Sequence, residues 1–193
     1  MSGVLCLAEV SNGKFASPPG ELAAAAQLAA GAAGAAGAAG APGGPLTIGL
    51  VGPDAESLAG ELRSSFDRVL LAEPGAPRTY TGSGALAVAE AFFGACDPAV
   101  VVAAHTQRTR EWLPRLAFRH GAGLVTDCVG LAVENGTLIA SRPVFGGAAI
   151  AEFALNTTPA FVTVRAKAFP PASEPGDGGA GAPPGTGAAG RVA

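Results

Sequence analysis

The sequence predicts an α/β fold in which a mostly parallel sheet has helices on both of its faces. Short apolar runs alternate with helix-like segments through residues 4–120, a pattern typical of parallel strands joined by crossover helices. Residues 99–104 read Ala-Val-Val-Val-Ala-Ala, a continuous apolar run typical of a strand buried on both faces. With 193 residues, the chain has room for one compact domain and some additional length.

The amino-terminal part contains a strand, a helix and a low-complexity tract. Residues 4–10 form an apolar run that ends at the turn signal Ser11-Asn12-Gly13, which predicts the first strand. Good helix formers over residues 21–30 follow a proline pair, which predicts a helix. Residues 31–45 begin with a Gly-Ala-Ala repeat. Because each glycine costs a helix about 1 kcal/mol relative to alanine, we expect a flexible insertion there.

The middle of the chain continues the alternation of strands and helices. Strands are predicted at residues 46–51 and 68–72, with a helix over residues 53–65 between them that opens on a Pro-Asp pair. A helix near residues 85–95 precedes the central apolar strand, and another is predicted over residues 109–120. This order places successive parallel strands beside one another in one sheet.

The pattern changes after residue 121. Apolar runs at residues 129–134 and 137–141 flank Asn135-Gly136, the strongest short hairpin signal in the chain. Two further strands are predicted at residues 149–155 and 160–164. We therefore expect antiparallel strands at the carboxyl-terminal end of the sheet.

The last 22 residues have a different composition from the rest. Residues 172–193 are mostly Gly, Pro, Ala and Thr, and Val192 is their one large apolar residue. Such a segment buries too little apolar surface to offset the entropy of ordering. The sequence thus predicts one domain over residues 1–171, followed by a disordered tail over residues 172–193.

Composition and charge narrow the classes of function. A net charge of −3 argues against sequence-independent nucleic-acid binding, which requires a basic face. The long apolar run at residues 22–41 is mostly Ala and Gly and has too little hydrophobicity for a membrane span, and no targeting peptide is recognisable at the amino terminus. Cys6, Cys96 and Cys128 are far apart and odd in number, which favours buried thiols over a disulfide or a metal site.

Charged residues follow the central apolar strand, where an open α/β sheet leaves a crevice at its carboxyl edge. Arg108 and Arg110 are candidates for clamping an anion near a helix start. Their helix also carries Glu111 with two arginines at i+4 and i+8, which is typical of a solvated ion-pair face. His105 follows the strand end, where acid–base groups are often found, although a lone histidine is more often structural. The sequence predicts neither catalytic residues nor a metal site.

The segment Arg142-Pro-Val-Phe-Gly146-Gly147 predicts a shaped loop. A proline fixes one step of the backbone after the arginine, and the paired glycines permit close approach of another backbone. One interpretation is a tight turn with Arg142 paired to Asp127; the other is a role at an interface or a ligand edge.

Several segments, taken in order along the chain, match one family. They are Val4-Leu-Cys-Leu-Ala-Glu, Asp97-Pro-Ala-Val-Val-Val-Ala-Ala-His, Pro114-Arg-Leu-Ala, Gly123-Leu-Val-Thr-Asp, Arg142-Pro-Val-Phe-Gly-Gly and Val162-Thr-Val-Arg with Phe169-Pro-Pro. This ordered set resembles the amino-terminal domain of the alpha subunit of electron transfer flavoprotein. The resemblance implies a three-layer α/β/α domain, similar to adenine nucleotide alpha hydrolases, with antiparallel strands at its carboxyl-terminal end.

The resemblance also implies a function. The domain is expected to be a non-enzymatic scaffold that docks the beta subunit and binds no nucleotide of its own. FAD is expected only in the full heterodimer, which would carry electrons from acyl-CoA-type dehydrogenases of fatty acid β-oxidation to the respiratory chain. Its compartment would be the cytoplasm in a bacterium or the mitochondrial matrix in a eukaryote. The residues expected at the inter-subunit face or beside the flavin module are Arg110, Arg142, Gly146, Gly147 and Arg165.

The sequence departs from the family in three places. The family has Tyr-Gly-Gly-Asn where this chain has Phe145-Gly-Gly-Ala148, and Gly-Arg-Asp where it has Thr109-Arg-Glu111. The family continues after Phe169-Pro-Pro into a second domain that holds most of the FAD, whereas the predicted tail begins here. Two alternatives therefore stay open: a stand-alone adenine-nucleotide-binding or regulatory domain that uses the crevice beside His105 and Arg108, or a fragment without activity.

Overall fold

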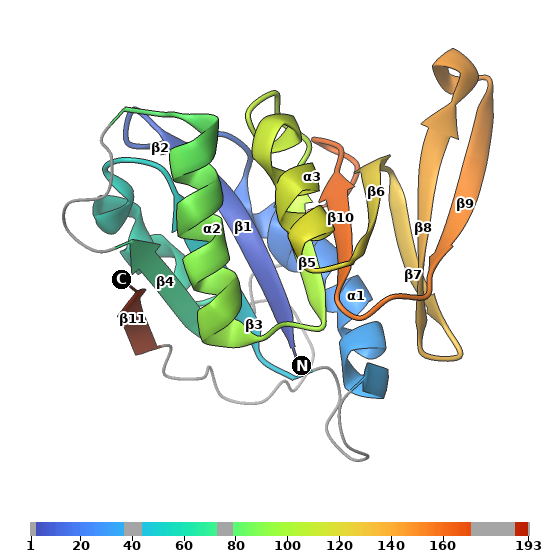
Figure 1. Ribbon diagram of the computed structural model, residues 1–193, viewed down its shortest axis with the longest axis horizontal. Coiled ribbons are helices and arrows are strands. Elements are labelled where there is room, and N and C mark those ends of the chain that lie inside the picture. Colours follow the sequence, from blue (N-terminus) through green and yellow to red (C-terminus); the bar gives the residue numbers. More distant parts are fainter. Residues whose placement is uncertain (1–2, 37–43, 73–78, 171–187, 193) are drawn as a thin grey trace.

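The computed structural model describes residues 3–36, 44–72, 79–170 and 188–192, and these form a parallel sheet between two helical layers (Figure 1). In spatial order the parallel strands are β11 (Ala188–Val192), β4 (Arg68–Ala72), β3 (Leu46–Val51), β1 (Val4–Ser11), β5 (Val100–Ala104), β10 (Ala160–Val164) and β6 (Gly123–Cys128). A short strand, β2 (Lys14–Phe15), pairs antiparallel with β1 across the predicted turn. The predicted fold class is confirmed.

Helices cover both faces of the sheet and build a separate core on each. On one face, α2 (Gly82–Cys96) and α3 (Thr109–Arg119) bury Phe92 and Trp112 against the strands. On the other face, α1 (Pro19–Ala36) and the 3-10 helix η1 (Ala55–Leu62) bury Leu22 and Leu62. Strand side chains alternate between the two cores, with Leu5 and Leu7 in the first and Val4 and Cys6 in the second, because successive residues of a strand point to opposite faces.

A second, antiparallel sheet packs against α1 and the edge strand β6. It consists of β7 (Gly130–Glu134), β8 (Thr137–Val144) and β9 (Ala149–Leu155), in that order. Leu131, Leu138 and Leu155 join the core that α1 shares with the main sheet. The outer half of the β8–β9 hairpin extends away from the body of the molecule (Figure 1). The predicted antiparallel strands thus exist, but they form a sheet of their own.

Two strands near the carboxyl-terminal end differ from the prediction. Residues 160–164 were expected to extend the antiparallel region, whereas β10 is an interior parallel strand between β5 and β6. Its residues are all buried, as a strand flanked on both sides requires. The sequence did not predict β6, since its Gly and Asp residues have low strand propensity and its register shifts at a bulge beside β10.

The two low-complexity segments also contain regular structure. The insertion predicted at residues 31–45 is wrong for residues 31–36, which continue α1; Gly31 lies against Val133 of β7, so packing offsets its low helix propensity. The disordered tail predicted for residues 172–193 is wrong for residues 188–192, which form β11 and extend the folded region past the boundary at residue 171. Backbone pairing with the edge of β4 needs no large side chain. Residues 37–43 and 172–187 lie outside the described part of the chain.

The three cysteines are separate free thiols. Cys6 and Cys128 are buried, as predicted, whereas Cys96 is half-buried at the end of α2. Burial raises the pKa of Cys128 to about 12 and raises the pKa of Cys6 as well, so both stay protonated. Across the described ranges, no cluster of His, Cys, Asp and Glu side chains has the composition of a metal site, and no helix is long and apolar enough to cross a membrane.

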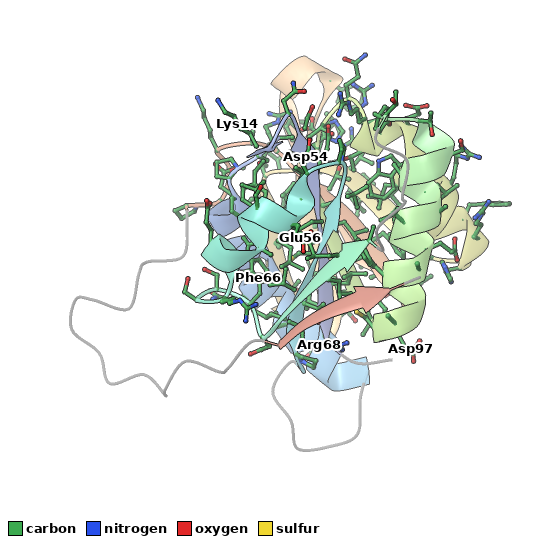
Figure 2. The ribbon with its side chains drawn as sticks, turned by 90° about the vertical axis from the view of Figure 1, so that its left-hand side faces the viewer. Lys14, Asp54, Glu56, Phe66, Arg68 and Asp97 are labelled. Carbon is green, nitrogen blue, oxygen red and sulfur yellow. The ribbon has the colours of Figure 1, made fainter. Side chains whose placement is uncertain are left out.

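The strand order creates a switch point at the carboxyl edge of the sheet. From β1 the chain winds outward through β3 and β4, and it then returns to place β5 on the other side of β1. In Figure 2, Lys14 and Asp54 lie at the end of the sheet where β1 and β3 finish, and Arg68 and Asp97 lie at the opposite end. Open α/β sheets bind ligands beside such a switch point.

Candidate functional site

A carboxylate of the chain itself fills the floor of the switch-point crevice. Glu9, near the end of β1, has a side chain only 8% exposed, and its Oε1 lies 3.2 Å from Nη1 of Arg108. The hydroxyl of Thr106 donates to Glu9 Oε2 over 2.6 Å. This same hydroxyl accepts a hydrogen bond from the backbone N–H of Thr109 and so fixes the start of α3. The crevice is therefore held together by internal contacts between β1 and the β5–α3 loop.

A second carboxylate and an aromatic ring complete the crevice. The Tyr80 hydroxyl donates to Oε2 of Glu111 over 2.8 Å, and the Arg108 guanidinium lies 4.5 Å from the centre of the Tyr80 ring. Burial and the contact with Glu111 raise the pKa of Tyr80 to about 12, which keeps it a donor. Gly82 lies against Glu111, so a side chain at residue 82 would displace that carboxylate from its present position.

The open crevice has a volume of about 500 Å³, but its charges do not fit the pyrophosphate of FAD or of an adenine nucleotide. Two of its lining residues, Glu9 and Glu111, are carboxylates, and they repel phosphate. Its one arginine, Arg108, is already neutralised by Glu9 and stacked on Tyr80. Arg108, one of the two candidates for clamping an anion, instead has an internal carboxylate partner in Glu9.

Four of the five predicted interface residues meet in one groove at the base of the β8–β9 hairpin. We call it the arginine groove; it has a volume of about 420 Å³ and is lined by Asp127, Arg142, Pro143, Val144, Phe145, Gly146, Gly147 and Arg165. The fifth predicted residue, Arg110, does not line the groove and is exposed at the start of α3. β6, β8 and the end of β10 thus bring together residues that are up to 38 positions apart.

Asp127 and Arg165 form a fork-shaped ion pair on one wall of the groove. The Nε and Nη2 atoms of Arg165 donate to the two oxygens of Asp127 over 2.9 and 2.6 Å. These hydrogen bonds are the main reason that the pKa of Asp127 is below its ordinary value. Asp127 has a left-handed backbone at φ 63°, which turns its carboxylate towards Arg165 at the bulge of β6.

Arg142 does not pair with Asp127, which was one of the two interpretations of its loop. Its Nη1 donates instead to Thr126 Oγ1 over 3.1 Å, because Arg165 occupies both oxygens of Asp127. Leu138, Ala140 and Arg142 lie on the inward face of β8, and the arginine follows two buried residues. Its Nε is buried and has no hydrogen-bond partner among the residues that the structure describes.

His105 lies beside the groove at the end of β5. Its Nδ1 is 2.8 Å from Thr163 Oγ1, and the same hydroxyl accepts the backbone N–H of Asp127. Burial lowers the pKa of His105, and Asp127 opposes this effect, while nearby arginines, Arg142 among them, add to it. His105 is thus a neutral, structural neighbour of the groove at pH 7.

The hairpin has exposed apolar side chains at its tip and along β9. Phe145 is 87% exposed, Ile150 is 58% exposed and Phe153 is 42% exposed. Gly146 and Gly147 have φ of 66° and 94°, and a Cβ at either residue would meet no other atom. The predicted close backbone approach at these glycines is therefore wrong; they are needed for the left-handed turn.

Reasoning from the sequence missed Glu9, Tyr80 and Thr163. A signal existed for Glu9, since it is the one charged residue in the apolar run of residues 4–10. Tyr80 and Thr163 gave none, because Tyr80 reaches the crevice from the loop before α2 and Thr163 is buried inside β10. The exposed apolar tip was missed because residues 149–155 read as an ordinary strand.

Comparisons with known proteins agree with this architecture. A family model described as "Electron transfer flavoprotein domain" matches residues 15–190. The chain is 33% identical over 118 residues to the electron transfer flavoprotein subunit alpha of Bacillus subtilis, a match that covers 60% of this chain and 36% of that protein.

Two further relatives have similar identity to this chain. Identity is 32% over 123 residues with the lactate dehydrogenase (NAD(+),ferredoxin) subunit LctC of Acetobacterium woodii, covering 62% of this chain and 29% of that one. The chain is also 32% identical over 127 residues to protein FixB of Clostridium saccharobutylicum, a match that covers 64% of this chain and 38% of that protein. The matches thus cover about a third of the length of these curated relatives. The resemblance to alpha subunits is confirmed, and the chain belongs to the electron transfer flavoprotein domain family.

Proposed function

We propose that this chain is a docking domain of an electron transfer flavoprotein, and that it binds a beta subunit through the β8–β9 hairpin and the arginine groove. The observation that carries the proposal is the set of exposed large apolar side chains on the projecting hairpin: Phe145 in the lining of the groove, and Ile150 and Phe153 on the two faces of β9. Large apolar side chains gathered on a projecting element mark an interaction surface. The family match and the alpha-subunit relatives support the choice of partner.

We further propose that the assembled carrier takes electrons from acyl-CoA-type dehydrogenases towards the respiratory chain, in the cytoplasm of a bacterium or in the mitochondrial matrix of a eukaryote. A relative whose name contains lactate dehydrogenase makes lactate oxidation the comparison to include. Reduction of the purified heterodimer by each dehydrogenase, followed by flavin absorbance, separates the two donors. Reduction by neither would contradict this assignment.

The proposal also places FAD outside this domain. The crevice at the switch point has Glu9 and Glu111 on its walls, and Arg108 is engaged by Glu9, so a pyrophosphate would meet repulsion there. We expect the purified chain to contain no flavin and to show no saturable uptake of labelled AMP or ATP. Flavin at one-to-one stoichiometry would overturn the placement of FAD, and saturable nucleotide uptake would favour a nucleotide-binding domain.

Docking is tested with two phenylalanines that are matched in exposure. Phe145 at the hairpin tip is 87% exposed and Phe118 on α3 is 86% exposed, so Phe145→Ser and Phe118→Ser remove equal surfaces in different places. We expect Phe145→Ser to weaken binding of the beta subunit about 10-fold or more, as loss of an aromatic interface residue does, and Phe118→Ser to leave it unchanged. Titration calorimetry with purified beta subunit measures both. Equal affinities for the two variants would exclude the hairpin tip from the interface.

A further inference from the structure

The arginine groove has a positive charge without an anionic partner among the described residues. Asp127 is the one carboxylate in its lining, and Arg165 already occupies both oxygens of that carboxylate. Arg142 has only a neutral hydroxyl, Thr126 Oγ1, as its partner, and its Nε is buried without an acceptor. A buried N–H of a charged group that lacks an acceptor destabilises the free chain. The groove therefore has an unfilled requirement for an anion at Arg142.

The strand register shows what surrounds this guanidinium. Arg142 pairs with Ala151, Ala140 pairs with Phe153 and Val144 pairs with Ala149. Directly paired residues of antiparallel strands have their side chains on the same face, so Arg142 shares its face with an exposed phenylalanine and small apolar residues. A small free anion would neutralise the charge and leave this apolar surface in water. A protein segment with one carboxylate among apolar side chains would neutralise the charge of Arg142 and would also cover the apolar surface.

We propose that Arg142 is the receptor for one carboxylate of the beta subunit, an Asp or Glu side chain that enters the arginine groove and accepts hydrogen bonds from the terminal N–H groups of the guanidinium. The inference rests on the proposed docking function and names the chemistry of the contact. A planar guanidinium binds a carboxylate through two parallel N–H groups, which makes such a pair strong and specific in geometry. Gly146 and Gly147 keep the mouth of the groove free of side chains.

Two readouts on one variant test this role. Arg142→Met removes the charge and keeps an unbranched apolar side chain. We expect the melting temperature of the free chain to stay the same or rise, because an unsatisfied buried N–H is lost. We expect the dissociation constant for the beta subunit to rise about 30-fold or more, because the partner carboxylate would be left buried and unpaired. A residue that only supports the fold would lower the melting temperature instead.

Three further variants separate the effects of charge, of the fork-shaped geometry and of position. Arg142→Lys keeps the charge but loses the fork geometry, so its affinity should lie between wild type and Arg142→Met. Arg115→Met removes an exposed arginine of α3 and should change neither readout. Arg142→Glu should abolish binding, and a Lys substitution at the facing acidic residue of the beta subunit should restore it. Restoration by one such substitution would identify the partner carboxylate.

The outcomes separate the inference from the function on which it rests. If wild-type chain does not bind the beta subunit, both fail. If wild type binds and Arg142→Met binds within about threefold of it, the carboxylate receptor is wrong while docking stands. Inorganic phosphate that binds wild type but not Arg142→Met, with heterodimer affinity unchanged, would likewise overturn the inference and leave a site for small anions.

Discussion

At the scale of single residues, the sequence predicted where the two arginines of the groove lie but not which side chains they contact. Arg142 and Arg165 were both expected at a functional edge, and the structure places both in one groove. One of the two interpretations of the Arg142 loop paired this arginine with Asp127, whereas Arg165 is the partner, since the choice depends on the left-handed backbone of Asp127 and on the bulge of β6. The sequence signals neither the left-handed backbone nor the bulge, because a single aspartate adopts a left-handed conformation only where its tertiary context requires it.

The Asp127–Arg165 pair predicts a pH dependence. Because the folded state lowers the pKa of Asp127, its ionised form stabilises the protein above about pH 4, and this contribution is lost as the pH falls through the lowered folded pKa. Asp127→Asn keeps the tolerance for a left-handed backbone and should lower the free energy of unfolding at pH 7 by less than about 1 kcal/mol, since the pair is solvated.

The difference in free energy of unfolding between wild type and Asp127→Asn should shrink as the pH is lowered from about 4. Urea unfolding followed by the fluorescence of Trp112, the single tryptophan and a fully buried one, measures the effect. Glu134→Gln, at an exposed residue of β7, is the control. A constant difference between pH 7 and pH 3 would show that the charge of Asp127 is irrelevant.

At the scale of elements, sequence periodicity identified those whose pattern is local. The strands β1, β3, β4 and β5 and the three α-helices were found because continuous apolar runs and helix formers mark them. The Asn-Gly turns of β1–β2 and β7–β8 were found because both residues have positive φ, which Asn and Gly tolerate best. The position of β10 and the existence of β6 were not found, because long-range pairing decides them.

Two glycines in neighbouring elements predict opposite effects of the same substitution. A methyl group on Gly49 of β3 would collide with the ring of Phe92, so Gly49→Ala should destabilise the protein by about 1–3 kcal/mol through overpacking. Gly94 is exposed in the last turn of α2 and has open space at its Cβ, so Gly94→Ala should stabilise the protein by up to about 1 kcal/mol.

Urea unfolding of the two glycine variants and wild type under one condition gives both values. The test is whether the two substitutions change the free energy of unfolding in opposite directions. A stabilising Gly49→Ala would mean that α2 packs less closely on β3 than the structure shows.

At the scale of the whole molecule, the fold separates a packed body from a projecting arm. Residues 143–150 contribute no side chain to either core, whereas the base of the same hairpin is held by Leu138 and Leu155. The alternation of apolar runs and helix-like segments along the sequence predicted the body and its layers. The arm was not predicted, because a strand that extends beyond its neighbours has the same local pattern as one that does not.

This separation predicts that the arm can be removed without unfolding the body. Because Arg142 pairs with Ala151, replacing residues 143–150 by Asn-Gly joins two opposite residues with a two-residue hairpin turn. We expect the melting temperature to change by no more than a few degrees, as for removal of solvated surface, and beta-subunit binding to be lost. Calorimetric melting and a binding titration measure the two. Loss of the folded state would show that the arm supports the body.

The insertion of β10 between β5 and β6 has a consequence during synthesis of the chain. Among the described strands, β6 pairs with the main sheet only through β10, which lies more than 30 residues later. While the ribosome has made β6 but not yet β10, the nascent polypeptide has an open edge at β5 and a strand that cannot attach to it. Unpaired edges of this kind are sites of aggregation. The segment that builds the β7–β9 sheet therefore sets how long this vulnerable intermediate lasts.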